Sequence, residues 1–288
     1  MEQYIKFPSL NKSRQRLSNL QQKLITQKTG NNFDISKIPA LFVVNGSLPL
    51  ESPSMMSPSS NGPTLSAVFY FGIKERTIEL LELLAVGERG KSADAQVEKA
   101  GTNNADNMPS VRLLGRFCSD ASVDDKVFSR FKAIGMVRNY DKAGMPSMFK
   151  SFNGKPVLIR NRDHIKGKMY RKENKIHFFV FKRDHHSTTE AALFDYIRFC
   201  SVGASGRLRR SSPTEKNAPL EMTVDIRTWP YLAKQGLGYL LSGSSKCELD
   251  VGFVIEGQAD EELPEALLGG VHLNKIELDE CLQWEDAI

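Results

Sequence analysis

Long apolar runs are missing from this sequence, and so is the leader of a secreted protein. No stretch approaches the roughly 20 apolar residues that a membrane-spanning helix needs. Residues 1–30 hold six basic residues and one acidic residue but no apolar segment, which argues against a secretory signal. We expect a cytoplasmic protein, soluble or attached to the surface of a membrane, and an organellar transit peptide within residues 1–30 is the alternative.

Cysteine is scarce, with four residues in a chain of 288, and no two of them form a CxxC pair. Cys118, Cys200, Cys247 and Cys281 are widely spaced among apolar neighbours. This spacing indicates neither a zinc site nor a disulfide framework, so we expect buried thiols in a reducing compartment.

Catalytic motifs are missing too, because there is no Gly-x-Ser-x-Gly elbow and no cysteine with a credibly placed histidine. Ala85–Ser92, AVGERGKS, fits a relaxed phosphate-loop pattern, but such a loop must follow a buried strand. The preceding residues, ERTIELLELL, predict a helix, so a solvated loop is the better interpretation. His185 and His186 would point to opposite faces of a strand and have no third ligand.

An acidic turn, QADEELPE at Gln258–Glu265, contains three glutamates that could be imagined as an acid–base pair. We interpret them as solvated carboxylates at the start of a short helix that begins at Pro264 and ends at Gly269 and Gly270. We therefore expect no enzyme, no metal and no cofactor.

The net charge of +5 is unevenly distributed along the chain. Residues 150–216 hold 16 Lys and Arg against 6 Asp and Glu, whereas residues 217–288 hold 4 against 14. This asymmetry predicts either an anion-binding face or two segments that lie side by side and neutralise each other.

Alternation of apolar and polar residues is the clearest structural signal. It predicts a half-buried strand at Cys247–Glu256 and a second strand at Val271–Leu278, with a bulge at Asn274 or Lys275 where the apolar positions change phase. Further strands are expected at Ile38–Leu48, Leu65–Ile73, Phe131–Arg138, Lys155–Arg160, Lys175–Lys182 and Leu220–Arg227. Helices are expected at Ser13–Leu24, Glu75–Val86, Met145–Phe152, Thr188–Cys200 and after Thr228, and a loop at Gly87–Pro109. Strands and helices do not alternate regularly, so the pattern predicts an α+β fold, with a largely antiparallel curved sheet and a few helices around a single core.

The helix after Thr228 carries the most regular apolar stripe, in which apolar residues recur at helical spacing. The stripe consists of Trp229, Leu232, Ala233, Gly236, Leu237, Leu240 and Leu241. Thr228 suits the N-cap and Gly243 the C-terminus of this helix. We expect the stripe to be buried, with Gly236 allowing the helix to lie close to the sheet.

Several segments together are typical of one known family. They are IPALFVVNGSL at Ile38–Leu48, AVFYFGI at Ala67–Ile73, RFKAI at Arg130–Ile134, NGKPVLI at Asn153–Ile159, LEMTVDI at Leu220–Ile226 and Leu249–Leu278 with FVIEGQADEELPEALLGGVHLN. In these segments the chain resembles the C-terminal domain of the plant Enhanced Disease Resistance Two proteins. In plant members this domain follows a pleckstrin-homology domain and a START lipid-binding domain, in proteins that restrain defence signalling at membranes. The resemblance implies no catalytic residues, and the phosphoinositide-binding role of the family belongs to the pleckstrin-homology part.

The chain departs from the family pattern in two places. Residues 1–37 show nothing similar to the opening of the domain, and Lys168–Asn217 intervene after the His-x-x-Gly turn at His164–Gly167. We therefore expect a polar, basic N-terminal segment at residues 1–32 and a domain at residues 33–288 with an inserted segment at residues 168–217. A function particular to this protein would be found in that insertion.

The basic residues in and beside the insertion are the candidate site. They are Lys166, Lys168, Arg171, Lys172, Arg207, Arg209 and Arg210. We expect them to bind the headgroups of lipids or an anionic membrane surface, and an ordinary solvated loop is the alternative. The leading hypothesis is a non-enzymatic, regulatory module that binds lipid or membrane. A protein–protein scaffold is the first rival, and nucleic-acid binding is less favoured because the C-terminal segment is strongly acidic.

Overall fold

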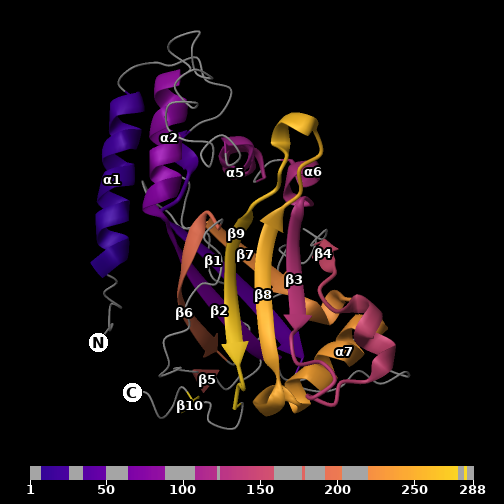
Figure 1. Ribbon diagram of the computed structural model, residues 1–288. Helices are drawn as coiled ribbons and strands as arrows, with labels where there is room; N and C mark the ends of the chain where they lie inside the picture. Colours follow the sequence, from indigo (N-terminus) through magenta and orange to yellow (C-terminus); the bar gives the residue numbers. More distant parts are fainter. Residues whose placement is uncertain are drawn as a thin grey trace.

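Two four-stranded β-sheets lie face to face and enclose the main hydrophobic core (Figure 1). The computed structural model describes residues 8–25, 35–49, 64–87, 108–121, 124–158, 177–178, 192–202, 220–277 and 282–283. The first sheet has the strand order β6-β2-β1-β7 and the second has the order β4-β3-β8-β9. All of their strand pairs are antiparallel except β1 with β7, which is parallel. The predicted α+β class with a largely antiparallel sheet is therefore confirmed, with the strands divided between two sheets.

The strands of the two sheets come from distant parts of the sequence. The first sheet contains β1 (Leu41–Pro49), β2 (Thr64–Ile73), β6 (Phe194–Val202) and β7 (Leu220–Asp225). The second contains β3 (Phe131–Val137), β4 (Pro156–Leu158), β8 (Glu248–Ile255) and β9 (Leu267–Asn274). A separate short pair is formed by β5 (His177–Phe178) and β10 (Leu282–Gln283).

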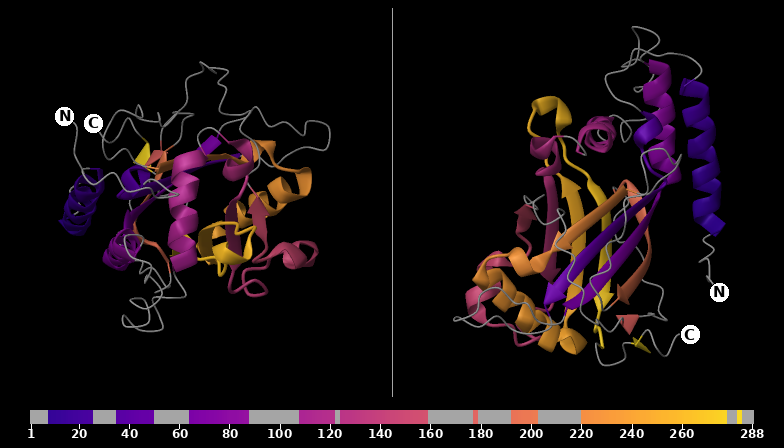
Figure 2. Two further views of the ribbon diagram at one scale, coloured as in Figure 1. Left: turned by 90° about the horizontal axis from the view of Figure 1, so that it is seen from above. Right: turned by 180° about the vertical axis from the view of Figure 1, so that it is seen from behind.

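Helices lie at the corners and ends of the two sheets (Figure 2). The α-helices are α1 (Pro8–Ile25), α2 (Glu75–Gly87), α5 (Met108–Asp120), α6 (Asp125–Phe128) and α7 (Tyr231–Ser242). The 3₁₀ segments are η1 (Ile35–Lys37), η2 (Ser147–Phe152), η3 (Ile226–Thr228), η4 (Ser244–Lys246) and η5 (Asp260–Glu262). Helices α1 and α2 lie side by side, α5 covers one end of the core, and α7 lies near the opposite end (Figures 1 and 2).

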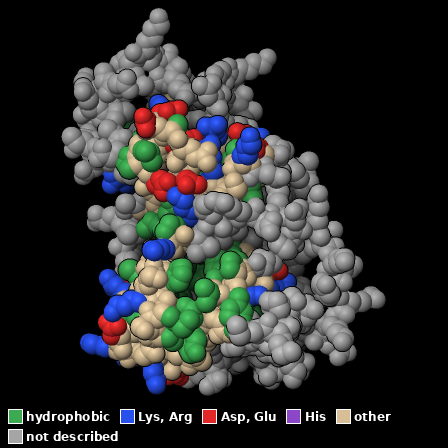
Figure 3. Space-filling view, turned by 90° about the vertical axis from the view of Figure 1, so that its right-hand side faces the viewer, with side chains coloured by type: hydrophobic (Ala, Val, Ile, Leu, Met, Phe, Trp, Pro, Cys, Tyr) green, Lys and Arg blue, Asp and Glu red, His purple; other side chains and the backbone are tan. Residues whose placement is uncertain are grey.

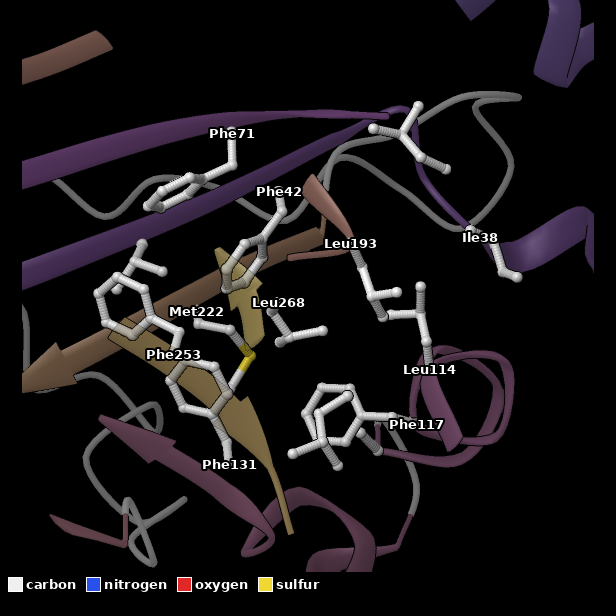
Figure 4. Close-up of a cluster of buried hydrophobic side chains, with 14 of the residues drawn as sticks. Ile38, Phe42, Phe71, Leu114, Phe117, Phe131, Leu193, Met222, Phe253 and Leu268 are labelled. Carbon is white, nitrogen blue, oxygen red and sulfur yellow. The ribbon is translucent and has the colours of Figure 1, made fainter. Parts of the chain in front are cut away.

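Phenylalanine rings from both sheets fill the middle of the core (Figure 4). The ring of Phe253 on β8 lies 5.8 Å from those of Phe71 and Phe131 and 6.1 Å from that of Phe42, measured between ring centroids. From α5, Phe117 points into the same cluster, with its ring 6.4 Å from Phe131. The alternation in the strands placed these rings on the inward faces, so the two sheets share one core.

Helix α1 belongs to this core, although it lies within residues 1–32. Leu17 and Leu20 are buried in the main cluster. The Gln21 side-chain amide donates hydrogen bonds to the carbonyl oxygens of Ile35 and Ile38. Buried apolar contacts and satisfied carbonyls thus fix α1 against the first sheet.

Close approach of the two sheets depends on Gly269 in β9. A Cβ atom at this position would lie 2.6 Å from Cδ1 of Phe71, closer than van der Waals contact allows. Pairing of Phe253 with Gly269 and of Val254 with Leu267 leaves Leu268 as a β-bulge, with its side chain in the core. The bulge predicted at Asn274 or Lys275 is wrong, because β9 ends at Asn274 and Lys275 follows it with a positive φ of 50°.

Replacing Gly269 by alanine should lower the free energy of unfolding by about 1–3 kcal/mol, because the new methyl group forces the Phe71 ring or the backbone to move. Urea denaturation of the variant measures this loss. The matched control is Gly135→Ala in β3, where nothing lies within 4 Å of the added Cβ. If both variants were equally stable, the sheets would not be in contact at Gly269.

Two helices expected from the sequence are wrong. Residues of the expected helix Thr188–Cys200 form strand β6, which pairs with β2. Apolar residues at a spacing of three suggested a helix, but the β-branched and aromatic residues of FDYIRFCSV suit a strand, and β2 offers a free edge. The expected helix at Pro264 is also wrong, since η5 precedes Pro264 and Gly270 lies inside β9.

Helix α7 is confirmed, but its buried face differs from the predicted stripe. It begins at Tyr231 after Pro230, not at an N-cap Thr228, and Gly243 follows its end as expected. Leu232 is exposed, whereas Lys234 is buried and donates to the Arg227 carbonyl oxygen. Gly236 faces the ring of Phe149 in η2, so this glycine lets α7 lie close to η2 and not to the sheet.

Candidate functional site

The seven basic residues predicted as the site lie outside the described residues. Lys166, Lys168, Arg171 and Lys172 fall in residues 159–176, and Arg207, Arg209 and Arg210 fall in residues 203–219. Of the expected insertion, residues 177–178 and 192–202 are described, and they form strands β5 and β6. The anion-binding face therefore stays a prediction.

The other sequence motifs lie only partly within the described residues. Residues Glu75–Gly87 form helix α2, which confirms that no strand precedes the phosphate-loop-like segment, and residues 88–92 of that segment lie outside the described residues. His185 and His186 also lie outside them. Among described residues, no group of three His, Cys, Asp or Glu is placed to hold a metal ion.

Of the three glutamates in the acidic turn, Glu261 and Glu265 are exposed as the sequence suggested, but Glu262 is not solvated. Glu262 is buried, and its carboxylate accepts hydrogen bonds from Arg130, from Arg116 and from the backbone N–H of Gln258. Glu265 instead pairs with Lys132 at 3.3 Å. Since the Glu262 oxygens are held by these donors, the turn stabilises the fold rather than providing an acid–base pair.

An exposed cluster of large apolar side chains is the most unusual surface of the described structure. It consists of Met136 on β3, Met148 and Phe152 on η2, and Leu232 and Tyr239 on α7. Their exposed fractions are 38%, 61%, 57%, 49% and 48%, respectively. Among described residues, Leu263 is the other exposed large apolar side chain, and it lies beyond the opposite end of β8. We call the five residues the apolar patch (Figure 3).

The patch is presented by a small core of its own, separate from the main one. Val137, Tyr140, Phe149 and Cys247 are buried together, and Leu240 of α7 packs against them. The Phe149 and Tyr239 rings lie 5.7 Å apart. Phe149 thus points inward from η2 while its neighbours Met148 and Phe152 remain exposed.

Side-chain hydrogen bonds hold the loop that carries η2. Asn139 donates to the carbonyl oxygen of Lys246 and accepts from the N–H of Glu248, at 2.8 and 2.9 Å. Asn153 bonds both the N–H and the carbonyl oxygen of Val137, at 2.7 and 3.0 Å. The Tyr140 hydroxyl donates to the Pro146 carbonyl oxygen at 2.7 Å. Because these bonds fix both ends of the loop, η2 is ordered before it meets any ligand.

Cationic side chains lie along one edge of the apolar patch (Figure 3). They are Arg138, Lys142, Lys150, Lys155 and Lys246, all exposed. Arg138 pairs with Asp250 at 3.2 Å and Lys150 with Asp141 at 2.9 Å, whereas the Lys155 ammonium lies 6.0 Å from the centre of the Phe152 ring. The apolar patch therefore has a rim with net positive charge.

Sequence reasoning overlooked this surface for a physical reason. Leu232 was assigned to the buried stripe of α7, because periodicity alone does not say which side of a helix a neighbouring loop covers. A signal was present in η2, where Met148, Phe149 and Phe152 leave this short segment apolar on more than one side. Such a segment must expose some of its apolar side chains unless it is enclosed.

None of the described helices combines the length and the apolar character that crossing a membrane requires. No significant match to this chain was found among curated proteins or among solved structures. The family described as Protein ENHANCED DISEASE RESISTANCE 2, C-terminal, matches residues 5–277, nearly the whole chain. This match begins within residues 1–37, where the sequence showed no similarity, and it includes α1. The resemblance inferred from the sequence is thus confirmed, and the chain belongs to the family of the C-terminal domain of the ENHANCED DISEASE RESISTANCE 2 protein.

Proposed function

We propose that this protein is a non-enzymatic module that binds anionic membrane surfaces, with the apolar patch entering the interface and the cationic rim contacting lipid headgroups. The observation that carries the proposal is the combination of five exposed apolar side chains with a rim of five Lys and Arg. A water-exposed cluster of this kind marks an interaction site on a soluble domain. Its rim charge favours an anionic partner.

The chemistry of the side chains suits the boundary between water and lipid. Tyr239 joins an apolar ring to a polar hydroxyl, and the long stems of lysines extend along apolar surface while their ammonium groups stay in water. Each basic residue close to an anionic leaflet contributes about 1 kcal/mol, and Met148 and Phe152 gain by leaving water. Residues 150–216, with 16 Lys and Arg against 6 Asp and Glu, support the same charge preference.

The fixed geometry of η2 supports the proposal as well. A loop that must become ordered on binding loses conformational entropy at that step. Here Asn139 and Asn153 already anchor the loop to the strands. Little ordering is therefore required when Met148 and Phe152 insert.

Replacing Met148 and Phe152 together by serine should weaken binding to vesicles that contain phosphatidylserine by roughly tenfold or more, because two large apolar side chains no longer leave water. Sedimentation over a series of lipid concentrations measures the affinity. Both side chains are exposed, so the fold should be retained, and circular dichroism checks this.

The matched control is Leu263→Ser, which removes an exposed leucine from the far end of β8 and should bind as the unaltered protein does. Vesicles of phosphatidylcholine alone should bind more weakly, and added salt should reduce binding to the anionic vesicles. Unchanged binding by the Met148 and Phe152 variant would contradict the proposal. A defined protein complex on the patch, without any vesicle binding, would instead favour a protein–protein scaffold.

A further inference from the structure

The apolar patch contains two sulfur atoms. Two of its five residues, Met136 and Met148, are methionines, and both side chains are exposed. The sulfur of Met136 lies beside Gly154, 3.6 Å from where a Cβ would stand, in the turn that directly follows η2. Met222, by contrast, is buried in the main core. Both methionine side chains are thus accessible from water to a small polar oxidant.

The thiols that the structure describes are poor competitors for such an oxidant. Burial raises the pKa of the Cys118 thiol to about 12 and also raises the pKa of Cys247. Since the thiolate is the form that reacts with peroxides, these two cysteines stay largely unreactive at neutral pH. A thioether carries no proton, so its reactivity depends on exposure and not on pH.

We propose that Met136 and Met148 form a redox-sensitive site, whose oxidation by hydrogen peroxide releases the protein from the membrane. A sulfur lone pair attacks one peroxide oxygen, the O–O bond breaks, and the departing hydroxide takes the remaining proton and leaves as water. Sulfur is oxidised by two electrons to the sulfoxide and the peroxide is reduced. A methionine sulfoxide reductase, supplied with a thiol reductant, reverses the change by forming a disulfide and water.

The proposed function requires the apolar patch to be apolar, and oxidation of its methionines makes the patch more polar. A sulfoxide is a strong hydrogen-bond acceptor, and moving it from water into the interface leaves that acceptor without its water partners. The rim of Lys and Arg is unaltered, so weak electrostatic attraction remains while insertion is lost. The predicted release from the membrane rests on the proposed membrane function. The predicted selective oxidation of Met136 and Met148 does not depend on that function.

The first experiment measures selectivity without any lipid. Protein treated with limiting hydrogen peroxide is digested, and mass spectrometry follows the addition of one oxygen to each methionine peptide. Met136 and Met148 should be oxidised well before the buried Met222, while circular dichroism remains unchanged. Oxidation of Met222 at the same rate, or earlier oxidation of Cys118 or Cys247, would overturn the assignment of the site.

The second experiment compares vesicle binding before and after oxidation. The oxidised protein should bind vesicles containing phosphatidylserine roughly tenfold more weakly. Treatment with methionine sulfoxide reductase should restore binding. The control variant Met136→Leu with Met148→Leu keeps the patch apolar but removes both sulfur atoms. The binding of this variant before peroxide treatment is its own reference, and peroxide should leave that binding unchanged.

The two proposals fail in different ways. If the unoxidised protein does not bind vesicles, the proposed membrane function and the proposed release from the membrane are both wrong. The peptide masses still show whether Met136 and Met148 are the methionines that are oxidised first. If the unoxidised protein binds and the oxidised protein binds equally well, the redox inference alone is overturned. Equal loss of binding by the leucine variant after peroxide would place the sensitive sulfur elsewhere and also overturn it.

Discussion

Replacing Phe253 by alanine should lower the free energy of unfolding by about 3–5 kcal/mol, a large part of the stability of an ordinary domain. Its ring lies within 6.1 Å of those of Phe42, Phe69, Phe71 and Phe131, measured between ring centroids. Three of these rings belong to the first sheet and one to the second, so the alanine variant leaves a cavity exactly where the sheets meet. Neither sheet can close that cavity without moving against the other.

Urea denaturation, followed by tryptophan fluorescence and circular dichroism, measures the effect on Phe253→Ala. The matched control is Phe152→Ala, which removes the same ring from the exposed apolar patch and should change stability by less than about 1 kcal/mol. A small loss for Phe253→Ala, similar to that of the control, would show that the two sheets do not share a core.

Much of the fold could be predicted because its strands alternate cleanly. In β8, Leu249, Val251 and Phe253 recur at every second position, and this pattern depends on local sequence alone. Helix α5 had a readable signal too, with Val111, Leu114 and Phe117 at helical spacing.

Pairing between distant strands could not be predicted in the same way. The parallel pair β1–β7 joins Phe42 to Leu220, and no local pattern specifies such a partner. Strand β6 was taken for a helix because the edge of β2, which it occupies, is invisible in the sequence of β6 itself. Tertiary contacts decided these elements, and the helical spacing of apolar residues gave the wrong answer for β6 although its residue types suit a strand.

The candidate site was the least predictable part, because exposure is a property of the assembled fold. Composition pointed to the basic residues near the insertion, but it could not show that Met148 and Leu232 reach the same surface from η2 and α7. The sequence did suggest the class of partner, since the excess of Lys and Arg in residues 150–216 favours an anionic one. The apolar component of the proposed contact came from the structure.

The carboxylate of Glu262 is buried and accepts hydrogen bonds from both guanidinium and backbone N–H groups. Each of its oxygens lies 3.0 Å from Nη1 of Arg130, which is also buried. The backbone N–H groups of Gln258 and Ala259 donate to one of these oxygens. Nε of Arg130 has no hydrogen-bond partner among the described residues, and the ion pair with Glu262 compensates the charge of this guanidinium.

Replacing Glu262 by glutamine should therefore lower the free energy of unfolding by about 3–5 kcal/mol at neutral pH, because a buried guanidinium loses its counter-charge. Glu265→Gln, which removes a charge of the same kind from a more exposed pair with Lys132, should cost less than about 1 kcal/mol. Urea denaturation of both variants gives the comparison. Equal losses would show that the Glu262 pair is as well solvated as the Glu265 pair.

Stability measurements at acid pH should show that the charge of Glu262 causes the stability difference between the unaltered protein and Glu262→Gln. Burial alone would raise the pKa of Glu262, but the N–H of Gln258 and the guanidinium of Arg130 outweigh it, so the net pKa lies below its usual value. A carboxyl group with a lowered pKa in the folded state stabilises the fold above its unfolded pKa, about 4.3, and loses that contribution as the pH falls through the folded pKa. The stability difference between the unaltered protein and Glu262→Gln should accordingly be constant near neutral pH and shrink below about pH 4. A difference that persisted undiminished in acid would mean that shape or packing, and not the carboxylate charge, makes Glu262 necessary.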